Sequence, residues 1–462
     1  SGTQGLAVTN KIHDDDGDVM SVFWNKNDTT RQLLYGSSII DIPASSGSGT
    51  SSLTSVNNYT FDVNNDIDCL GDIILKLKFN VNSASVALNI GGKTVPSPVP
   101  STMSTTLTDT SKVAQAYDSF LAGKFYNQEL LKAIDRVEIM VGTQIWQTLH
   151  RADIMSLAST ELSSGSFVDY CFQSSGGVNN YNQFSNRTTL DTFIGPGDGL
   201  IVYVPIKSFT KTLSPILENF SEQTEDGYLM AAAPHQQVKI RLYTSADIDP
   251  VVSGLFSLEV ALYAKNQIMC NEEREQIKSM PMGLPKRIKM TQNKTQAFDS
   301  SLPLLTEIDC DHFSLYASHL IISVPAFSTP GNNVKYLNNS TVELLLNSSS
   351  FSGKIPLGVL KLTGPTMGLF TNDYIYSDSK GDVKDYSSNY KFVFPLASQA
   401  YGGSSVPLNR FDNIRVKLNL LPGPSSDTSS TVGWSGTNYI NITCVGETTA
   451  LYKGGAASLA MY

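Results

Sequence analysis

The stretch AIDRVEIMVGTQIWQTLHRADIMSLASTEL, residues 133–162, decides the fold. Apolar and polar side chains alternate through VEIMV (137–141), a Gly turn follows, and QIW (144–146) forms a short return segment. Alternation with period two is typical of a strand with one buried face, so this part predicts a hairpin of two strands. Apolar residues then return at helical spacing, which predicts a helix over 149–162, at Ile154, Leu157, Ala158 and Leu162.

The same alternation recurs along the chain, in GDIILKLKF (71–79), QVKIRLY (237–243) and NIRVKLNLLP (413–422). Half-buried strands of this kind belong to antiparallel sheets that have one face on a core and one face in water. Long loops rich in Ser, Thr, Gly and Pro lie between the strands, at 43–55, 94–111, 163–180 and 422–436. Besides the helix at 149–162, only a short one at 271–280 is expected. Many strands with few helices predict sandwiches or jelly rolls, and 462 residues suffice for two.

The charge pattern disfavours a primary role in nucleic-acid binding. The formal net charge is −9, only 16% of the residues are charged, and the basic residues are scattered along the chain. Phosphate recognition requires clustered Lys and Arg. The one dense basic run, LPKRIKMTQNK (284–294), follows the acidic run EERE (272–275), and we interpret this region as a solvated inter-domain segment.

The cysteines and the apolar stretches bear on the cellular compartment. Five widely spaced cysteines without a CxxC motif predict reduced thiols in a chain made in the cytosol, at Cys69, Cys171, Cys270, Cys310 and Cys444. No secretory signal is visible at the start of the sequence, and no stretch reaches the roughly 18 consecutive apolar residues of a membrane helix.

The acidic stretch DDDGD (14–18) invites a calcium interpretation. If Gly17 took the glycine position of an EF-hand loop, Ile12 would stand at position one and Phe23 at the glutamate position, so the motif fails. A solvated acidic arm is the better interpretation.

The stretch DCDH (309–312) gathers residue types that bind metals. Alternation would, however, point Asp309 and Asp311 to one face and Cys310 and His312 to the other. We therefore interpret the stretch as the entrance of a strand.

Three further polar residues are candidates for chemistry. His150 and Asp153 are three residues apart on the predicted helix and could face the same way, but acid–base catalysis would also need a third group and a pocket. His235, just before a predicted strand, is as well explained by capping or packing. No GxSxG, GxxxxGK[ST], GxGxxG or HExxH motif occurs. We assign no catalytic, cofactor-binding or metal-binding residue, and expect neither enzymatic activity nor a cofactor.

The stretch at 133–162 resembles a signature segment of the major capsid proteins of nucleocytoplasmic large DNA viruses. Further segments resemble that family in order: LGDIILKLKF (70–79), the hairpin (133–149), LIVYVPI (200–206), AAAPHQQVKIRLY (231–243) and SLEVALYAKNQIMCNEERE (257–275). In the second half, HFSLYASHLIISV (312–324) looks like the first strand of a second barrel, VPLNRFDNIRVKLNL (406–420) resembles an internal strand, and TTALYKGGAASLAMY (448–462) resembles the closing strand. The resemblance spans most of residues 65–462. The chain departs from the family pattern after 206, where KSFTKTLSPILENF replaces an aromatic-rich run.

The resemblance implies a double jelly roll, two eight-stranded antiparallel sandwiches side by side, with long loops and a few short helices. It implies an N-terminal arm at 1–30, a first jelly roll at 31–265, a linker at 266–295 and a second jelly roll at 296–462. Three copies would form a homotrimeric, pseudo-hexagonal capsomer that tiles an icosahedral shell.

The resemblance also implies the partners and the location. The chain would contact neighbouring capsomers and, through its arm, minor capsid proteins and the internal membrane, without direct nucleic-acid binding. It would be made in the host cytoplasm and end in the virion. Two alternatives stay open: an internal scaffold of the same fold that shapes the viral membrane during assembly, and a carbohydrate-binding or carbohydrate-cleaving β-sandwich. The second is weakened because the three tryptophans are not clustered in sequence, at Trp24, Trp146 and Trp434.

Overall fold

The computed structural model describes the strand framework of the chain. The described residues are 36–47, 49–63, 67–81, 86–90, 93–96, 129–162, 200–207, 227–248, 253, 256–268, 275, 284–298, 304–325, 340–370, 375–377, 383–385, 389–398, 400, 405–421 and 438–459. The expected arm at 1–30, the acidic stretch at 14–18 and nearly all of the helix expected at 271–280 lie outside them.

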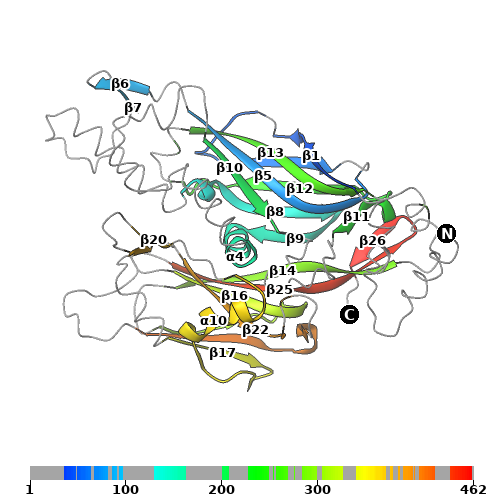
Figure 1. The fold of residues 1–462 in the computed structure, drawn as a ribbon, viewed down its shortest axis with the longest axis vertical. Coiled ribbons are helices and arrows are strands. Elements are labelled where there is room, and N and C mark those ends of the chain that lie inside the picture. The colour runs from blue at the N-terminus through cyan, green and yellow to red at the C-terminus, as the bar shows by residue number, and fades with distance from the viewer. Residues whose placement is uncertain are drawn as a thin grey trace.

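Two antiparallel β-sandwiches are stacked along the long axis of the molecule (Figure 1). In the first sandwich, the first sheet has the order β1-β13-β5-β10, with β11 on β5 and β3 on β13. The second sheet has the order β2-β4-β12-β8-β9. The bounds are β1 (Gly36–Ile42), β2 (Ala44–Ser46), β3 (Ser51–Ser52), β4 (Asn58–Val63), β5 (Cys69–Val81), β8 (Ile134–Val141), β9 (Gln144–His150), β10 (Leu200–Ile206), β11 (Tyr228–Leu229), β12 (Val238–Thr244) and β13 (Phe256–Ile268).

The second sandwich repeats this plan. It consists of the third and fourth sheets of the chain. The third sheet has the order β14-β25-β16-β22, with β23 on β16 and β26 on β25. The fourth sheet has the order β15-β24-β17-β18, with β19 on β17. The bounds are β14 (Leu284–Phe298), β15 (Leu304–Asp309), β16 (Tyr316–Pro325), β17 (Thr341–Leu346), β18 (Ser349–Ser350), β19 (Ile355–Pro356), β22 (Asn389–Pro395), β23 (Val406–Pro407), β24 (Ile414–Leu420), β25 (Asn438–Lys453) and β26 (Ala456–Leu459).

The remaining described elements are short. Two separate strand pairs are formed by β6 (Val86–Ile90) with β7 (Lys93–Pro96) and by β20 (Ile375–Ser377) with β21 (Val383–Asp385). The helices are α4 (Arg151–Glu161), α10 (Leu357–Thr366), and the 3-10 turns η3 (Glu129–Ala133), η6 (Met230–Ala232) and η8 (Leu408–Arg410). Helix α4 lies between the two sandwiches, whereas α10 packs on β22 of the second (Figure 1).

Alternation in the sequence explains the sandwich cores. The predicted strands are confirmed as β5, β12 and β24, the predicted hairpin as β8 and β9, and the predicted helix as α4. In each strand one row of apolar side chains is buried and the other row is not. The buried rows are Ile73, Leu75, Leu77 and Phe79 in β5, Val238, Ile240 and Leu242 in β12, and Ile414, Val416, Leu418 and Leu420 in β24.

Two predictions about the start of the second sandwich are wrong. The basic run at 284–294 is not a solvated segment but most of β14, which pairs with β25 along its whole length. The stretch at 312–324 is not the first strand of the second sandwich, because β14 and β15 precede β16. Strand β13 ends at Ile268, so strand residues occupy 266–268 and 284–295 of the predicted linker.

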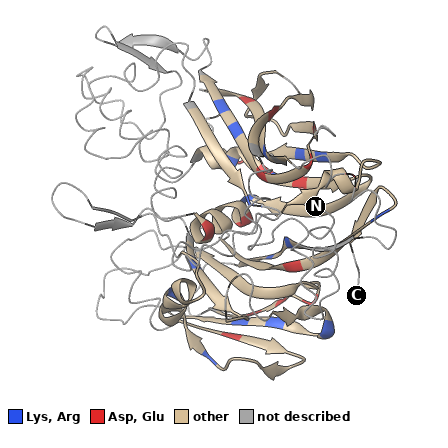
Figure 2. Cartoon of the chain, turned by 45° about the vertical axis from the view of Figure 1, so that its right-hand side comes forward, with Lys and Arg blue, Asp and Glu red and all other residues tan. Residues whose placement is uncertain are grey.

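Lys and Arg residues and Asp and Glu residues are spread over the strands of both sandwiches (Figure 2). On the outward faces, basic residues pair with acidic residues of a neighbouring strand. The nitrogen–oxygen distances are 3.4 Å for Lys78–Glu259, 3.4 Å for Lys239–Asp62 and 2.8 Å for Arg415–Glu307. This pairing leaves the strand lysines and arginines interspersed with carboxylates.

Candidate functional site

Helix α4 fills the space between the sandwiches, and its surroundings explain its composition. A helix on a protein surface has one apolar face and one polar face. In α4 both kinds of residue are buried: Asp153, Ile154, Ser156, Leu157, Ala158, Ser159, Thr160 and Glu161. The helix contacts β8, β9 and β10 of the first sandwich and β16 and β25 of the second. It is therefore covered from both sides, and its polar side chains must find partners within the protein.

The third sheet offers those partners on its outer face. The strand register places polar residues on one face of β14, β25 and β16, and six of them are buried: Lys289, Thr291, His319, Ser323, Asn441 and Thr443. The alternate residues point into the core of the second sandwich, among them Ile288, Met290, Ile442 and Ile322. In a sandwich standing alone such a polar face would lie in water. Here α4 of the first sandwich covers it.

Asp153 is the centre of one hydrogen-bonded cluster. Its Oδ2 accepts hydrogen bonds from the backbone N–H of His150 at 3.0 Å and from the side chain of Asn293. Its Oδ1 accepts from the Thr443 hydroxyl at 2.6 Å and from Asn441 Nδ2 at 3.3 Å. Burial raises the pKa of Asp153, and the four hydrogen bonds oppose that rise. One carboxylate thus ties the start of α4 to two strands of the second sandwich.

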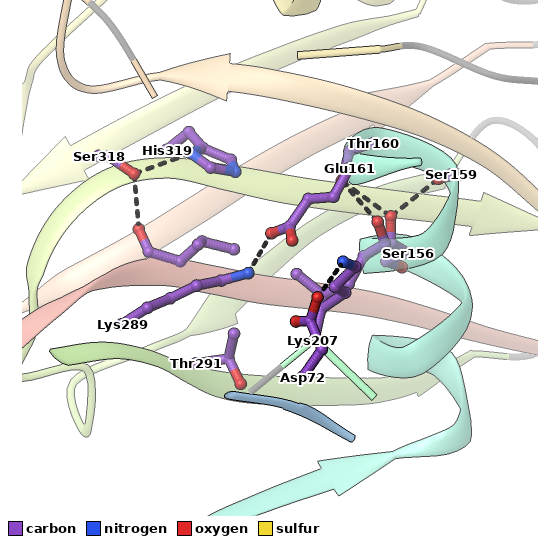
Figure 3. Close-up of polar contacts among 12 residues, drawn as sticks. Asp72, Ser156, Ser159, Thr160, Glu161, Lys207, Lys289, Thr291, Ser318 and His319 are labelled. Atoms are coloured by element: carbon purple, nitrogen blue, oxygen red, sulfur yellow. Dashed lines mark hydrogen bonds and ion pairs between the residues drawn. The ribbon is translucent and has the colours of Figure 1, made fainter. Parts of the chain in front are cut away.

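Glu161 and Lys289 form an ion pair at the other end of α4. Figure 3 shows Lys289 Nζ directed at Glu161 Oε1, and both side chains have 0% exposure. Burial lowers the pKa of Lys289, whereas the Glu161 carboxylate favours the charged ammonium. A second ion pair, Lys207–Asp72 at 3.1 Å, lies nearby on the first sandwich and also acts on the charge of Lys289.

We call this region the polar seam and define it as α4, the buried polar residues of the third sheet, Gln147 and Phe370. Three further contacts complete it. Gln147 Nε2 in β9 donates to the Thr291 hydroxyl in β14 at 2.7 Å, so the edge strands of the second and third sheets are linked. The Thr160 carbonyl accepts from the Phe370 N–H at 2.8 Å. His319 Nδ1 lies 2.8 Å from Ser318 Oγ. Burial, followed by the charge of Lys289, lowers the pKa of His319 to about 3.

The residues that the sequence offers as candidates for chemistry, among them His150 and Asp153, take part in holding the fold together. His150 precedes α4, and its backbone N–H is what contacts Asp153, so the pair helps to hold the start of a helix. The interpretation of 309–312 as a strand entrance is wrong, because Asp309 ends β15 and the next residues form the turn before β16. In that turn Cys310 is buried, whereas His312 is exposed with a ring nitrogen 2.8 Å from the Asn293 carbonyl oxygen.

The contacts of the polar seam connect the two sandwiches. Ser318 and His319 have the atoms of a nucleophile and a base, but a histidine whose pKa is about 3 is a weak base at neutral pH. Both residues are buried. Within the described ranges no group of three or more His, Cys, Asp and Glu could hold a metal ion. Among the same residues, no helix is long and apolar enough to cross a membrane.

The sequence offers Asp153 only as a candidate for acid–base chemistry, and it indicates neither the partners of Asp153 nor the Glu161–Lys289 pair. The partners of Asp153 in the second sandwich lie 140 to 290 positions further along the chain, so no local spacing reports them. The sequence does indicate the strand that carries Lys289. In RIKMT (287–291), Ile288 and Met290 alternate with polar residues as they would in a half-buried strand.

The whole fold has counterparts among solved structures. A quasi-atomic model of the PBCV-1 virus capsid superimposes with a TM-score of 0.58 at 11% identity, covering 93% of this chain and 97% of that one. The crystal structure of PBCV-1 VP54, fitted into a cryo-EM reconstruction of the virophage Sputnik, gives a TM-score of 0.56 at 12% identity with the same coverage. No protein-family model matches the sequence, and no curated protein does. The predicted fold is therefore confirmed: the chain is a double jelly roll like that of these viral capsid structures.

Proposed function

We propose that the chain is a structural major capsid protein of a large double-stranded DNA virus, and that three copies form one pseudo-hexagonal capsomer. The observation that carries the proposal is the extent of the structural likeness. It covers 93% of this chain and 97% of a PBCV-1 capsid chain, so it extends over both sandwiches. A likeness confined to one sandwich would suit many unrelated binding proteins.

The arrangement of the two sandwiches supports a role as a building unit of a shell. Each chain supplies two sandwiches of the same plan, and three chains with cyclic symmetry would supply six. Six similar units around an axis give a hexagonal outline, and hexagonal outlines pack side by side over a surface. This requires the two sandwiches of one chain to keep a fixed relation, which the polar seam provides through buried contacts at both ends of α4.

The same proposal assigns partners and location. Neighbouring capsomers would contact the sides of each trimer, and residues 1–30, outside the described part of the chain, would bind minor capsid proteins and the internal membrane. The mixed charges on the strands suit contacts with proteins better than contacts with nucleic acid (Figure 2). The protein would be made in the host cytoplasm and reside in the virion. Three described cysteines are buried, at Cys69, Cys310 and Cys444.

A measurement of mass in solution tests the trimer. One chain has a mass of 50.1 kDa, so three chains have a mass of about 150 kDa. Light scattering coupled to size exclusion at micromolar concentration should give the trimer mass, and negative-stain electron microscopy should show particles with a hexagonal outline. A stable monomer of 50.1 kDa would contradict the proposal.

The composition of purified virions separates the capsid protein from an internal scaffold with the same fold. A capsid protein should dominate the protein mass of mature particles, whereas a scaffold should be present in assembly intermediates and absent from mature particles. A carbohydrate-binding sandwich would instead be monomeric or dimeric and would bind a glycan in solution. No described feature of the polar seam favours that third interpretation.

A further inference from the structure

The hairpin of β25 and β26 crosses from the second sandwich to the first. Strand β25 forms the third sheet with β14 and β16, and its last residues, 450–453, also pair with β26. Figure 1 shows β26 beside β11, which belongs to the first sandwich. This contact lies away from the polar seam, in a separate set of residues.

Three hydrogen bonds join the hairpin to the first sandwich. The His235 N–H donates to the Gly455 carbonyl at 3.0 Å, and the Ala457 N–H donates to Gln236 Oε1 at 2.7 Å. The Leu229 N–H donates to the Tyr452 hydroxyl at 3.2 Å. The Gly455 carbonyl and the Ala457 N–H are backbone groups of the hairpin, so the contact depends on the path of the hairpin as well as on its side chains.

An aromatic cluster lies under these hydrogen bonds. The rings of Trp146 and Tyr228, both in the first sandwich, meet edge to face with centroids 5.3 Å apart. Tyr452 of the hairpin lies 5.6 Å from Tyr228. All three residues are buried, with exposures of 4%, 0% and 3%. Aromatic pairs at this spacing add attraction beyond their buried area.

Two glycines form the turn of the hairpin, and one of them, Gly455, lies against His235 of the first sandwich. Gly454 and Gly455 both have positive φ, +61° and +76°. A Cβ on Gly455 would overlap the His235 ring, at 2.8 Å from Nε2, whereas a Cβ on Gly454 would have nothing within 4 Å. Both glycines are favoured by the backbone, and a side chain at 455 would in addition displace the exposed ring of His235.

We propose that the β25–β26 hairpin is a clasp, a second joint that holds the second sandwich in its orientation on the first. It acts through Tyr452, Gly455 and Ala457 against Leu229, His235 and Gln236. The polar seam fixes one side of the junction and the clasp fixes another, so that rocking about α4 is prevented. If the proposed capsomer is correct, the clasp also sets the angle at which each chain presents its two sandwiches to the next.

Two matched glycine variants test the clasp. Gly454→Ala and Gly455→Ala impose the same kind of backbone strain, but only the second pushes against His235. We expect Gly455→Ala to increase the unfolding equilibrium constant more than Gly454→Ala does, because the exposed His235 ring has to leave its place against the hairpin. His235→Ala keeps the backbone N–H that bonds Gly455, and in the double variant it should remove most of that difference. Equal effects of the two glycine variants, or no relief from His235→Ala, would overturn the clasp.

Hydrogen exchange separates a clasp from a merely local turn. In Gly455→Ala the amides of Leu229 and His235, which belong to the first sandwich, should exchange faster, while the amides of β24 keep their protection. Faster exchange confined to residues 454–459 would contradict the proposal. The experiment applies equally to a monomer, so a failure of the trimer measurement and a failure of the clasp are distinct results.

Discussion

Replacing Lys289 by Met should destabilise the protein strongly. The ammonium group of Lys289 lies at 0% exposure against the equally buried carboxylate of Glu161. Removing it leaves that carboxylate in a dry site without its ion partner. Removing one member of a buried ion pair costs about 3–5 kcal/mol, because the remaining charge keeps its desolvation penalty and loses the attraction. We expect this loss in the free energy of unfolding at pH 7.

The double variant should recover most of the loss. With Glu161→Leu added to Lys289→Met, both charges are gone and two apolar side chains of similar length fill the site. Apolar replacement of a complete buried pair is often neutral, or stabilising by about 1–4 kcal/mol. The surface pair Arg415–Glu307 is the matched control, since its side chains are 44% and 38% exposed at a similar contact distance. Glu307→Gln should cost less than about 1 kcal/mol.

Equilibrium unfolding in urea, followed by far-ultraviolet circular dichroism and by tryptophan fluorescence, measures these differences. The coupling energy from the cycle of Glu161 and Lys289 variants should be several-fold larger than that of a cycle on Glu307 and Arg415. If Lys289→Met costs no more than Glu307→Gln, the pair does not hold the sandwiches together and the reasoning is refuted.

Three further outcomes are expected. Because burial holds the pKa of His319 at about 3 instead of 6.5, protonation favours the unfolded chain, and stability falls by about 1.4 kcal/mol per unit as pH drops from about 6.5 toward 3; urea unfolding at several pH values should show a shallower slope for His319→Asn, and equal slopes would contradict this. Gly446→Ala should destabilise by about 1–3 kcal/mol or more, because its Cβ would lie 2.5 Å from the Tyr316 carbonyl oxygen, and an unchanged thermal midpoint would contradict it. Deleting residues 1–30 should leave the trimer mass intact and impair particle assembly, whereas loss of the trimer would refute the proposed role of the arm.

The elements set by local pattern could be predicted from the sequence. Strands β5, β12 and β24 show unbroken alternation, and α4 follows the β8–β9 hairpin at helical spacing. In these stretches the residues that repeat with the period are the ones that enter a core. The two-sandwich fold required in addition the ordered resemblance to a known family, because alternation alone does not say which strands pair.

The polar seam could not be predicted, because its burial is created at long range. Lys289, Thr291 and Asn293 form the polar row of an amphipathic strand, and such a row is ordinarily the wet face of a sheet. The burial of Lys289 depends on α4, more than 120 positions away, as its contact with Glu161 shows. The polar residues that indicate a solvated segment at 284–294 therefore include the ones that join the two sandwiches.

The polarity of this joint has a physical consequence for a tile. An apolar joint of the same area would be attractive in many relative orientations, because the hydrophobic effect has no direction. The hydrogen bonds to Asp153 and the ion pair of Glu161 are satisfied in one orientation only, and any other leaves buried polar groups without partners at about 1–3 kcal/mol each. We infer that the polar seam trades some stability for a single angle between the sandwiches. The proposed ring of six sandwiches would need that selectivity, since an error in the angle within each chain would be repeated three times around the axis.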